Sequence, residues 1–292
     1  MDDEIGGGVG ASPVVGVEDE RVVGRGVSLW LKRDDLLHPA IPGNKWRKLV
    51  PNLRAARERG PRRLVTFGGA WSNHIAATAA AGRLFGFETV GVIRGEEHLP
   101  LNPVLAQAVA DGMRLVYMDR STYRRKHTPD VIEQLNDELG DFYLVPEGGS
   151  NELAVRSCRD IPSEIDLEFD VICCAVGTGG TLAGIAAGLR PEQCALGFSA
   201  LRGGGFLVDE VERLQVATFG ERLGRWDIEC GYHFGGFAKR TAGLDAFIAD
   251  FTDRHGVALE RVYVAKMLFG VLDLVQHGAF PDGTRIVAVV TG

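Results

Sequence analysis

The sequence predicts an α/β protein with two open, mostly parallel sheets that are flanked by helices in two domains. Short runs rich in β-forming residues alternate along the chain with longer segments of helical periodicity, which is typical of βαβ units. Two glycine-rich loops, at residues 68–74 and 177–181, each lie between an expected strand and an expected helix. A chain of 292 residues is long enough to form two such sheets.

The first half of the chain opens with an acidic, glycine-rich segment, residues 1–12, which we expect to be a disordered leader. Beyond the leader, the hydrophobic periodicity predicts strands and helices in alternation. The expected strands span residues 29–32, 64–67, 89–93, 115–118 and 143–145, and the expected helices span residues 44–59, 72–85, 103–111 and 130–139.

The second half continues the same alternation. Residues 171–176 are all apolar and predict a buried strand, which is followed by a helix at 181–189 and by strands at 195–199 and 286–290. We interpret residues 59–148 as a small domain, and residues 1–58 and 149–292 as a large domain.

Composition excludes several classes of function. The net charge of -7 favours neither nucleic acid nor an anionic membrane as a partner, and 45% hydrophobic with 24% charged residues is typical of a soluble globular enzyme. The longest apolar runs are too short to span a bilayer, and the leader lacks the pattern of a signal peptide. Five cysteines without a CxxC pair or metal-ligand spacing fit a reducing compartment. We therefore expect a cytoplasmic protein without a metal site.

The hexapeptide Gly-Asn-Lys-Trp-Arg-Lys at residues 43–48 carries two of only six lysines, Lys45 and Lys48, in a chain that otherwise prefers arginine. Lysine offers a primary amine that can lose its proton and attack a carbonyl, which arginine cannot do. The spacing of three residues places both lysines on one face if the segment is helical. A solvated basic patch at the start of a helix is the alternative interpretation.

The loop Gly-Thr-Gly-Gly-Thr at residues 177–181 follows a buried strand and opens a helix, so its backbone N–H groups and the helix dipole suit a phosphate. A tight strand-to-helix turn without a ligand is the alternative. A dinucleotide site is disfavoured because Leu182 replaces the third glycine of that pattern, and because the next strand ends in Ser199 rather than an acidic residue. The loop also lacks the Gly-Lys-Thr/Ser of a P-loop.

The loop at residues 68–74 ends in Ser72, Asn73 and His74. Ser72 is a plausible N-cap of the following helix, and Asn73 offers an amide to a ligand. Capping and turn formation alone explain the loop equally well. His74 by itself is more typical of a polar helix residue than of a catalyst.

An amine, a phosphate cradle and an amide-bearing loop together match the needs of pyridoxal 5′-phosphate. Four segments occur in a fixed order and resemble the pyridoxal-phosphate enzymes of the tryptophan-synthase-β fold, fold type II. The closest resemblance is to the branch of 1-aminocyclopropane-1-carboxylate deaminase and D-cysteine desulfhydrase. The segments are Lys-Arg-Asp-Asp-Leu at 32–36, Gly-Asn-Lys at 43–45 with Arg-Lys-Leu at 47–49, Ser-Asn-His at 72–74 and Gly-Thr-Gly-Gly-Thr at 177–181.

The resemblance implies a role for each of four residues in the first half of the chain. Lys45 would bind the aldehyde of the cofactor covalently, and Lys48 would help to neutralise its phosphate. Asn73 would hydrogen-bond the ring oxygen. Ser72 would face the substrate carboxylate or accept a proton.

The resemblance likewise implies that the large domain binds the cofactor. Tyr263 matches a family tyrosine above the cofactor, and Thr291 matches a threonine near the pyridine nitrogen in desulfhydrase-like members. The phosphate would be held by Gly177, Thr178, Gly179, Gly180 and Thr181.

Two positions depart from the deaminase pattern. Val264 stands where the deaminases carry a glutamate that pairs with the pyridine nitrogen, and Phe237 aligns with a second active-site tyrosine. Valine cannot sustain a protonated pyridine, and a hydroxyl such as that of Thr291 would leave the nitrogen largely neutral. These departures disfavour opening of a cyclopropane ring.

We therefore expect a pyridoxal-phosphate-dependent lyase, similar to D-cysteine desulfhydrase, that eliminates a β-substituent from a small amino acid to give a keto acid and ammonia. The alternatives are 1-aminocyclopropane-1-carboxylate deaminase, a specialised biosynthetic elimination or replacement, and a non-catalytic pyridoxal-phosphate-binding protein. The resembling enzymes are commonly dimers, so a homodimer is expected.

Overall fold

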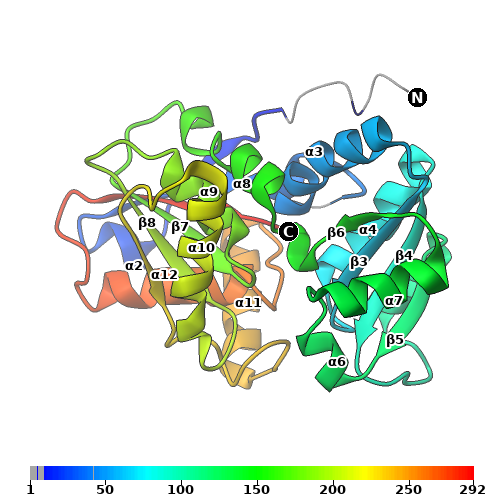
Figure 1. Cartoon of the computed structure of the whole chain (residues 1–292). Helices are drawn as coiled ribbons and strands as arrows, with labels where there is room; N and C mark the ends of the chain where they lie inside the picture. Colours follow the sequence, from blue (N-terminus) through cyan, green and yellow to red (C-terminus); the bar gives the residue numbers. More distant parts are fainter. Residues whose placement is uncertain (1–4, 6–9, 42) are drawn as a thin grey trace. The chain divides into compact units, whose positions relative to one another are not determined.

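The structure is a computed structural model that describes residues 5, 10–41 and 43–292. The chain forms two compact units (Figure 1). The small unit contains residues 45–151 together with Ile5, and the large unit contains residues 10–44 and 152–292. Each unit is built around its own sheet.

The large unit holds a six-stranded sheet in the order β1-β2-β10-β7-β8-β9. Only the pair β1 and β2 is antiparallel, and all other neighbours run parallel. Because β7 and β10 are parallel neighbours, Gly177 and Thr291 follow them at the same edge of the sheet, where the loops of α/β proteins bind ligands. The strands are β1 Val14–Val17, β2 Ser28–Arg33, β7 Val171–Val176, β8 Cys194–Ser199, β9 Trp226–Glu229 and β10 Arg285–Val290.

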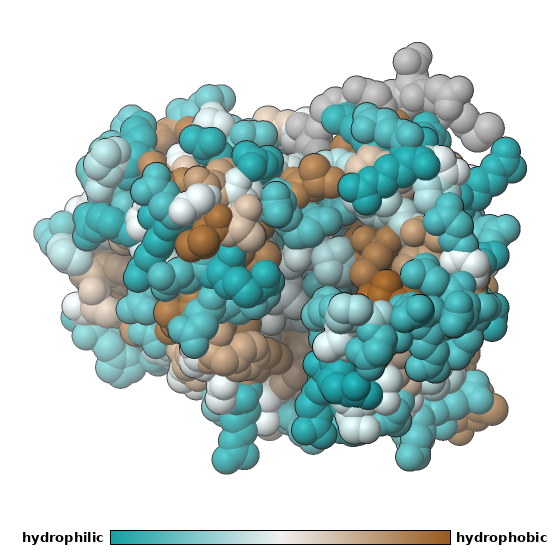
Figure 2. Space-filling model, viewed as in Figure 1, coloured by the Kyte–Doolittle hydropathy of each residue, from teal (hydrophilic) through white to brown (hydrophobic). Residues whose placement is uncertain are grey.

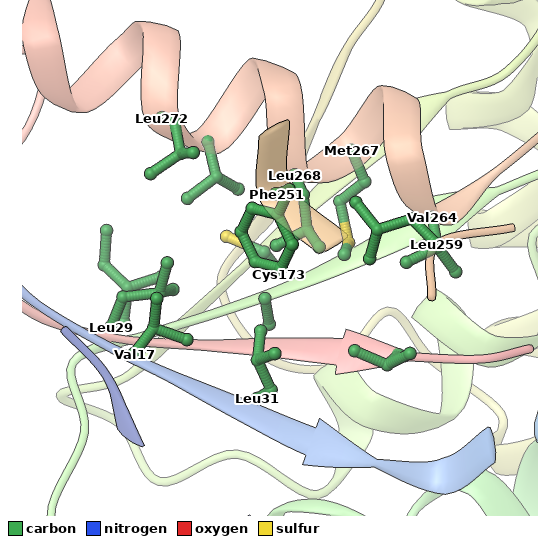
Figure 3. Packing of buried hydrophobic residues seen from close by; sticks show 14 of the residues in the cluster. Val17, Leu29, Leu31, Cys173, Phe251, Leu259, Val264, Met267, Leu268 and Leu272 are labelled. Carbon is green, nitrogen blue, oxygen red and sulfur yellow. The ribbon is translucent and has the colours of Figure 1, made fainter. Parts of the chain in front are cut away.

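Helices cover both faces of this sheet. Strand β7 shows why: Cys173 packs into one hydrophobic cluster, and Ile172 packs into another on the opposite face. The first cluster includes Leu31 from β2 and Leu268 from α12 (Figure 3). A strand buried on both faces needs the continuous apolar run that this sequence shows. The helices are α2 Glu20–Val23, α8 Glu152–Cys158, α9 Gly180–Ala187, α10 Leu207–Phe219, α11 Ala242–His255 and α12 Val264–Gln276.

The small unit holds a parallel four-stranded sheet in the order β5-β4-β3-β6. One face packs Phe67 of β3 against Leu135 of α7, and the other packs Ile75 of α4 with Leu105 of α5. The strands are β3 Arg63–Gly68, β4 Glu88–Arg94, β5 Arg114–Met118 and β6 Tyr143–Val145. The helices are α3 Asn44–Arg59, α4 Asn73–Phe85, α5 Pro103–Ala110, α6 Arg120–Arg124 and α7 Pro129–Leu139.

The predicted fold class is confirmed, since two mostly parallel sheets are flanked by helices. Every strand that we expected exists, with ends within one residue of the prediction. The sequence did not predict strands β1 and β9 or helices α2, α6, α8, α10, α11 and α12. Residues 1–4 and 6–9 of the expected leader lie outside the described residues. For Ser12, the expectation of disorder is wrong, because its side chain is buried and bonded to Lys32 and Asp34.

The division of the chain differs from the expected one at helix α3. We placed residues 45–58 in the large domain and 149–151 with them, whereas the structure groups both segments with the small unit. Side-chain contacts explain the difference. Trp46 stacks on Phe85 with ring centroids 5.8 Å apart, and the Asn52 side chain bonds those of Tyr143 and Asn151. The assignment of folding domains stays a prediction.

Hydrophilic side chains cover most of the visible face, interrupted by smaller hydrophobic areas (Figure 2). Within residues 5, 10–41 and 43–292, no helix combines the length and apolar character that crossing a membrane requires. The same residues contain no group of three or more histidine, cysteine, aspartate or glutamate side chains placed to hold a metal ion.

Candidate active site

The start of helix α3 is fixed by two contacts that immediately precede Lys45. Gly43 has a φ of +60°, and a Cβ at this position would lie 1.4 Å from the carbonyl oxygen of Thr291. Only glycine can adopt this conformation at such a close approach. The next residue, Asn44, donates from its side-chain amide to the hydroxyl oxygen of Thr181 at 2.9 Å. The close approach at Gly43 and the hydrogen bond of Asn44 therefore explain why these two residue types occur in the motif.

Lys45 and Lys48 occupy successive turns of α3, and the two differ in exposure. Lys45 is half-buried, whereas Lys48 is buried. The Lys48 ammonium donates to the carbonyl of Gly148 at 3.3 Å and to the hydroxyl of Ser150 at 3.2 Å. Lys48 thus binds the segment that follows strand β6, and the solvated basic patch is wrong for this residue.

Ser72 and Asn73 are half-buried at the start of α4. Ser72 occupies the N-cap position, as expected, with extended φ and ψ of -82° and 115°. Its side chain makes no capping hydrogen bond to α4, so capping does not explain a serine here. Gly68 lets the turn approach closely, since a Cβ there would lie 2.5 Å from the Ile75 side chain. The Ser72 hydroxyl therefore does not serve to cap α4.

His74 is fully buried, which the sequence did not reveal. Its Nε2 lies 2.8 Å from the hydroxyl oxygen of Thr66, and that hydroxyl donates its one hydrogen to the carbonyl of Val145 at 2.8 Å. Thr66 must therefore accept from His74, which assigns the proton to Nε2 and leaves a lone pair on Nδ1. Among the described residues, Nδ1 has no hydrogen-bond partner.

Burial, followed by the charges of Lys45 and Lys48, lowers the pKa of His74 well below its usual value. The imidazole is therefore uncharged at neutral pH and adds no third positive charge beside the two lysines. A Cβ on Gly149 would lie 3.4 Å from both Nδ1 of His74 and Cβ of Lys48. His74 and Lys48 of helix α3 therefore both pack closely against Gly149.

In the large unit, the glycine loop joins β7 to α9 in a shape that requires its glycines. A Cβ on Gly177 would lie 2.8 Å from Cε1 of Tyr263, and Gly179 has a φ of +80° with Val211 only 2.9 Å from a Cβ. Gly177 and Thr178 are half-buried, whereas Gly179, Gly180 and Thr181 are buried. The first N–H groups of a helix have no acceptor within it, and they carry a partial positive charge.

Tyr263 and Phe237 form an aromatic wall next to this loop. Their ring centroids lie 5.9 Å apart with an interplanar angle of 67°, an edge-to-face arrangement. Tyr263 immediately precedes α12, and Val264 is buried in the hydrophobic cluster of Figure 3. Thr291 is buried directly after β10. The position after Tyr263 therefore contributes to the core and carries no carboxylate.

The predicted site residues fall into two sets. The small unit holds Lys45, Lys48, Ser72 and Asn73, and the large unit holds residues 177–181, Tyr263 and Thr291. Sequence reasoning missed Asn44, whose position next to Lys45 was the available signal. It also missed Glu260, which accepts the N–H groups of Val262 and Tyr263 at 2.7 Å each and so fixes the segment that leads into α12.

Comparison with known proteins gives consistent matches. The family described as "Pyridoxal-phosphate dependent enzyme" matches residues 6–202. A Pyrococcus furiosus protein with the name "Putative 1-aminocyclopropane-1-carboxylate deaminase" is 33% identical over 91% of this chain and 85% of its own. The D-cysteine desulfhydrase of Serratia proteamaculans is 29% identical over 91% of this chain and 87% of its own. A crystal structure described as an ACC deaminase homologue superimposes with a TM-score of 0.83 at 26% identity, covering 97% of this chain and 89% of its own.

Proposed function

Because the chain belongs to the family of pyridoxal-phosphate-dependent enzymes, we propose that it eliminates a β-substituent from a small amino acid to give a keto acid and ammonia. With a thiol substrate of the D-cysteine type, one molecule of water would be consumed, and hydrogen sulfide, pyruvate and ammonia would be released. The resemblance inferred from the motifs, including the cofactor, is confirmed by these matches. The individual roles of the site residues remain part of the proposal.

The residues present suit pyridoxal phosphate. The glycines of the 177–181 loop keep space open beside Tyr263, and the N-terminus of α9 attracts an anion such as the cofactor's phosphate. Lys45 offers the amine that the aldehyde requires. The amide of Asn73 suits the ring oxygen, and the hydroxyl of Thr291 suits the pyridine nitrogen. When bound, the cofactor supplies an electron sink for the bond that breaks at Cα.

Lys45 would take the proton from Cα of the substrate. Such a base must be uncharged when it acts. His74 is itself uncharged, so it adds no positive charge beside Lys45. The Ser72 hydroxyl, which caps no helix, would hold the substrate carboxylate or accept a proton.

Two positions, Val264 and Phe237, favour elimination over ring opening. By resemblance, the ring-opening deaminases use a glutamate after the tyrosine and a second tyrosine opposite it. This chain has Val264 buried in the core and Phe237 packed against Tyr263. Neither side chain can hold a proton. Elimination needs a base at Cα and a stable leaving group, and it makes no use of these two missing groups.

A substrate panel tests the proposal. Purified protein loaded with the cofactor is given D-cysteine, L-cysteine and 1-aminocyclopropane-1-carboxylate, and sulfide, ammonia and keto acid are measured. We expect sulfide and keto acid from a cysteine, and loss of both in Lys45→Ala. Lys126→Ala, which removes a lysine paired with Glu147 at 3.1 Å, serves as the matched control and should turn over normally.

Other outcomes of the panel would support the alternatives. Ammonia from the cyclopropane substrate alone would show a deaminase, the activity that the name of the Pyrococcus relative indicates. Elimination or replacement on a larger substrate would show a biosynthetic enzyme, and a bound cofactor without any turnover would show a binding protein. The cytoplasmic location and the homodimer expected from the sequence also belong to the proposal, and size-exclusion chromatography with light scattering measures the latter.

A further inference from the structure

Lys266 is a buried lysine to which the proposed reaction assigns no role. It lies in α12, is 1% exposed, and donates from Nζ to the carbonyl oxygen of Gly236 at 2.8 Å and to that of Ala200 at 3.3 Å. Ala200 directly follows β8. One ammonium therefore joins a helix, the end of a strand and a loop within the large unit.

The electrostatic surroundings of Lys266 are sparse. Burial lowers its pKa, and the carboxylate of Glu260 opposes that change. Glu260 already accepts two backbone N–H groups, and its ionised form is disfavoured by burial, which raises its pKa. Within the described part of the chain, no carboxylate lies within 4 Å of the Lys266 ammonium. Backbone carbonyls are thus the direct partners of this charge.

The loop at residues 231–240, here the Phe237 loop, contains the Gly236 carbonyl and has a strained backbone. Phe234 and Ala238 have positive φ angles of 50° and 54°, which non-glycine residues rarely adopt. Such strain persists only where surrounding contacts impose it. Two contacts with α12 do so here: the Phe234 ring packs edge-to-face on Phe269 at 4.9 Å, and Lys266 binds Gly236.

The next residue after Gly236 is Phe237, which packs on Tyr263, and Tyr263 in turn lies against Gly177. The carbonyl that Lys266 holds is therefore one peptide unit away from the aromatic wall. A shift of the loop would move Phe237 relative to Tyr263. The position of the Phe237 ring against Tyr263 therefore depends on the position of the loop.

We propose that Lys266 is a positioning residue, a built-in cation that holds the Phe237 loop closed and so sets the aromatic wall against which the substrate side chain is selected. The last part of this statement rests on the proposed function, whereas the closure of the loop does not. Carbonyl oxygens that bind an ammonium also suit small monovalent cations. Ammonium or potassium ions should therefore replace the side chain where space has been made for them.

Limited proteolysis measures loop closure directly, because Lys239 and Arg240 are exposed trypsin sites within the Phe237 loop. In Lys266→Ala, cleavage at these two bonds, identified by mass spectrometry, should accelerate roughly tenfold or more, since a hydrogen bond to a charged group is worth about that factor. Ammonium or potassium chloride should restore protection to Lys266→Ala but not to Lys266→Met, whose side chain fills the space. Sodium-free choline chloride at equal ionic strength is the salt control.

Lys126→Ala is the matched control and should leave cleavage at these bonds unchanged. If Lys266→Ala does not fold, Lys266→Gln is used instead, because glutamine keeps a hydrogen-bond donor but has no charge. Trypsin should cleave Lys266→Gln several-fold faster than the wild type, and ammonium should not slow this cleavage. Cleavage of both variants at the wild-type rate would overturn the proposal. So would faster cleavage of Lys266→Ala that neither ion slows.

Kinetics on the cofactor-loaded enzyme test the link to the substrate. Lys266→Ala should raise KM roughly tenfold while kcat changes much less, and ammonium should restore KM. A merely structural defect would reduce the active fraction and therefore kcat, with KM unchanged. This result would contradict the proposal that the aromatic wall selects the substrate side chain. If the substrate panel shows no turnover at all, the proposed function fails, yet the proteolysis still decides whether Lys266 closes the loop.

Discussion

At the scale of single residues, the hydrogen-bond chain from His74 through Thr66 to Val145 fixes an uncharged imidazole inside the small unit. The sequence could not predict this. His74 follows Ser72 and Asn73 in a recognisable motif, but the proton on its Nε2 is assigned through Thr66 and the carbonyl of Val145, which lies 71 residues later. Asn73 and Ser72, in contrast, are identified from the motif alone, and their roles stay a prediction.

The buried His74 predicts a specific dependence of stability on pH. Its pKa is lowered in the folded state, so below its ordinary value of 6.5 the unfolded chain binds a proton that the folded chain does not. The free energy of unfolding therefore decreases as pH falls below 6.5, by up to about 1.4 kcal/mol per pH unit from this one group. Urea unfolding between pH 7 and pH 5 measures the slope, which should be shallower in His74→Gln.

His277 provides the matched control, because its side chain is 75% exposed. His277→Gln should show the slope of the wild type. An equal slope in the wild type and in His74→Gln would contradict a buried, uncharged His74.

At the scale of elements, two strand-to-helix loops present the candidate site residues, and both are shaped by glycines. The sequence predicted the strands before these loops because β7 is apolar and buried throughout, and because β3 is mostly apolar and buried after Arg63. It missed β1 and β9 because these edge strands are short and partly exposed, so they lack a strong hydrophobic pattern. Helix α12 was also missed, although nearly every residue from Val264 to Leu272 is buried.

The glycine loop of the large unit predicts that Gly177→Ala weakens cofactor binding. The added Cβ would lie 2.8 Å from the Tyr263 ring, so either the ring or the loop must move. Overpacking of this kind costs roughly 1–3 kcal/mol, and we expect the Kd for pyridoxal phosphate to rise about tenfold or more. Titration of the apoprotein, followed by absorbance, measures this constant.

Gly243→Ala is the control for the same change of residue, since a Cβ at Gly243 in α11 would meet no atom within 4 Å. It should bind the cofactor normally, and as a helical substitution it should not destabilise the fold. A Kd for Gly177→Ala within twofold of the Gly243→Ala value would show that the loop does not bind the cofactor.

At the scale of the whole molecule, the six lysines have distinct surroundings. Lys32 is buried and paired with Glu164 at 2.7 Å, and Lys126 is paired with Glu147. Lys48 and Lys266 hold backbone carbonyls, as described above, and Lys239 is exposed on the Phe237 loop. Lys45, which is half-buried like Lys126, differs from all five because it directly follows Gly43 and Asn44 in the sequence motif.

Covalent attachment of the cofactor to Lys45 can be tested directly. The protein loaded with pyridoxal phosphate is reduced with borohydride and digested, and the modified lysine is identified by mass spectrometry. We predict that the cofactor is found on Lys45, and that Lys45→Ala takes up no covalent label while Lys126→Ala is labelled as the wild type is. Label on another lysine of the wild-type protein, or undiminished labelling of Lys45→Ala, would contradict the account.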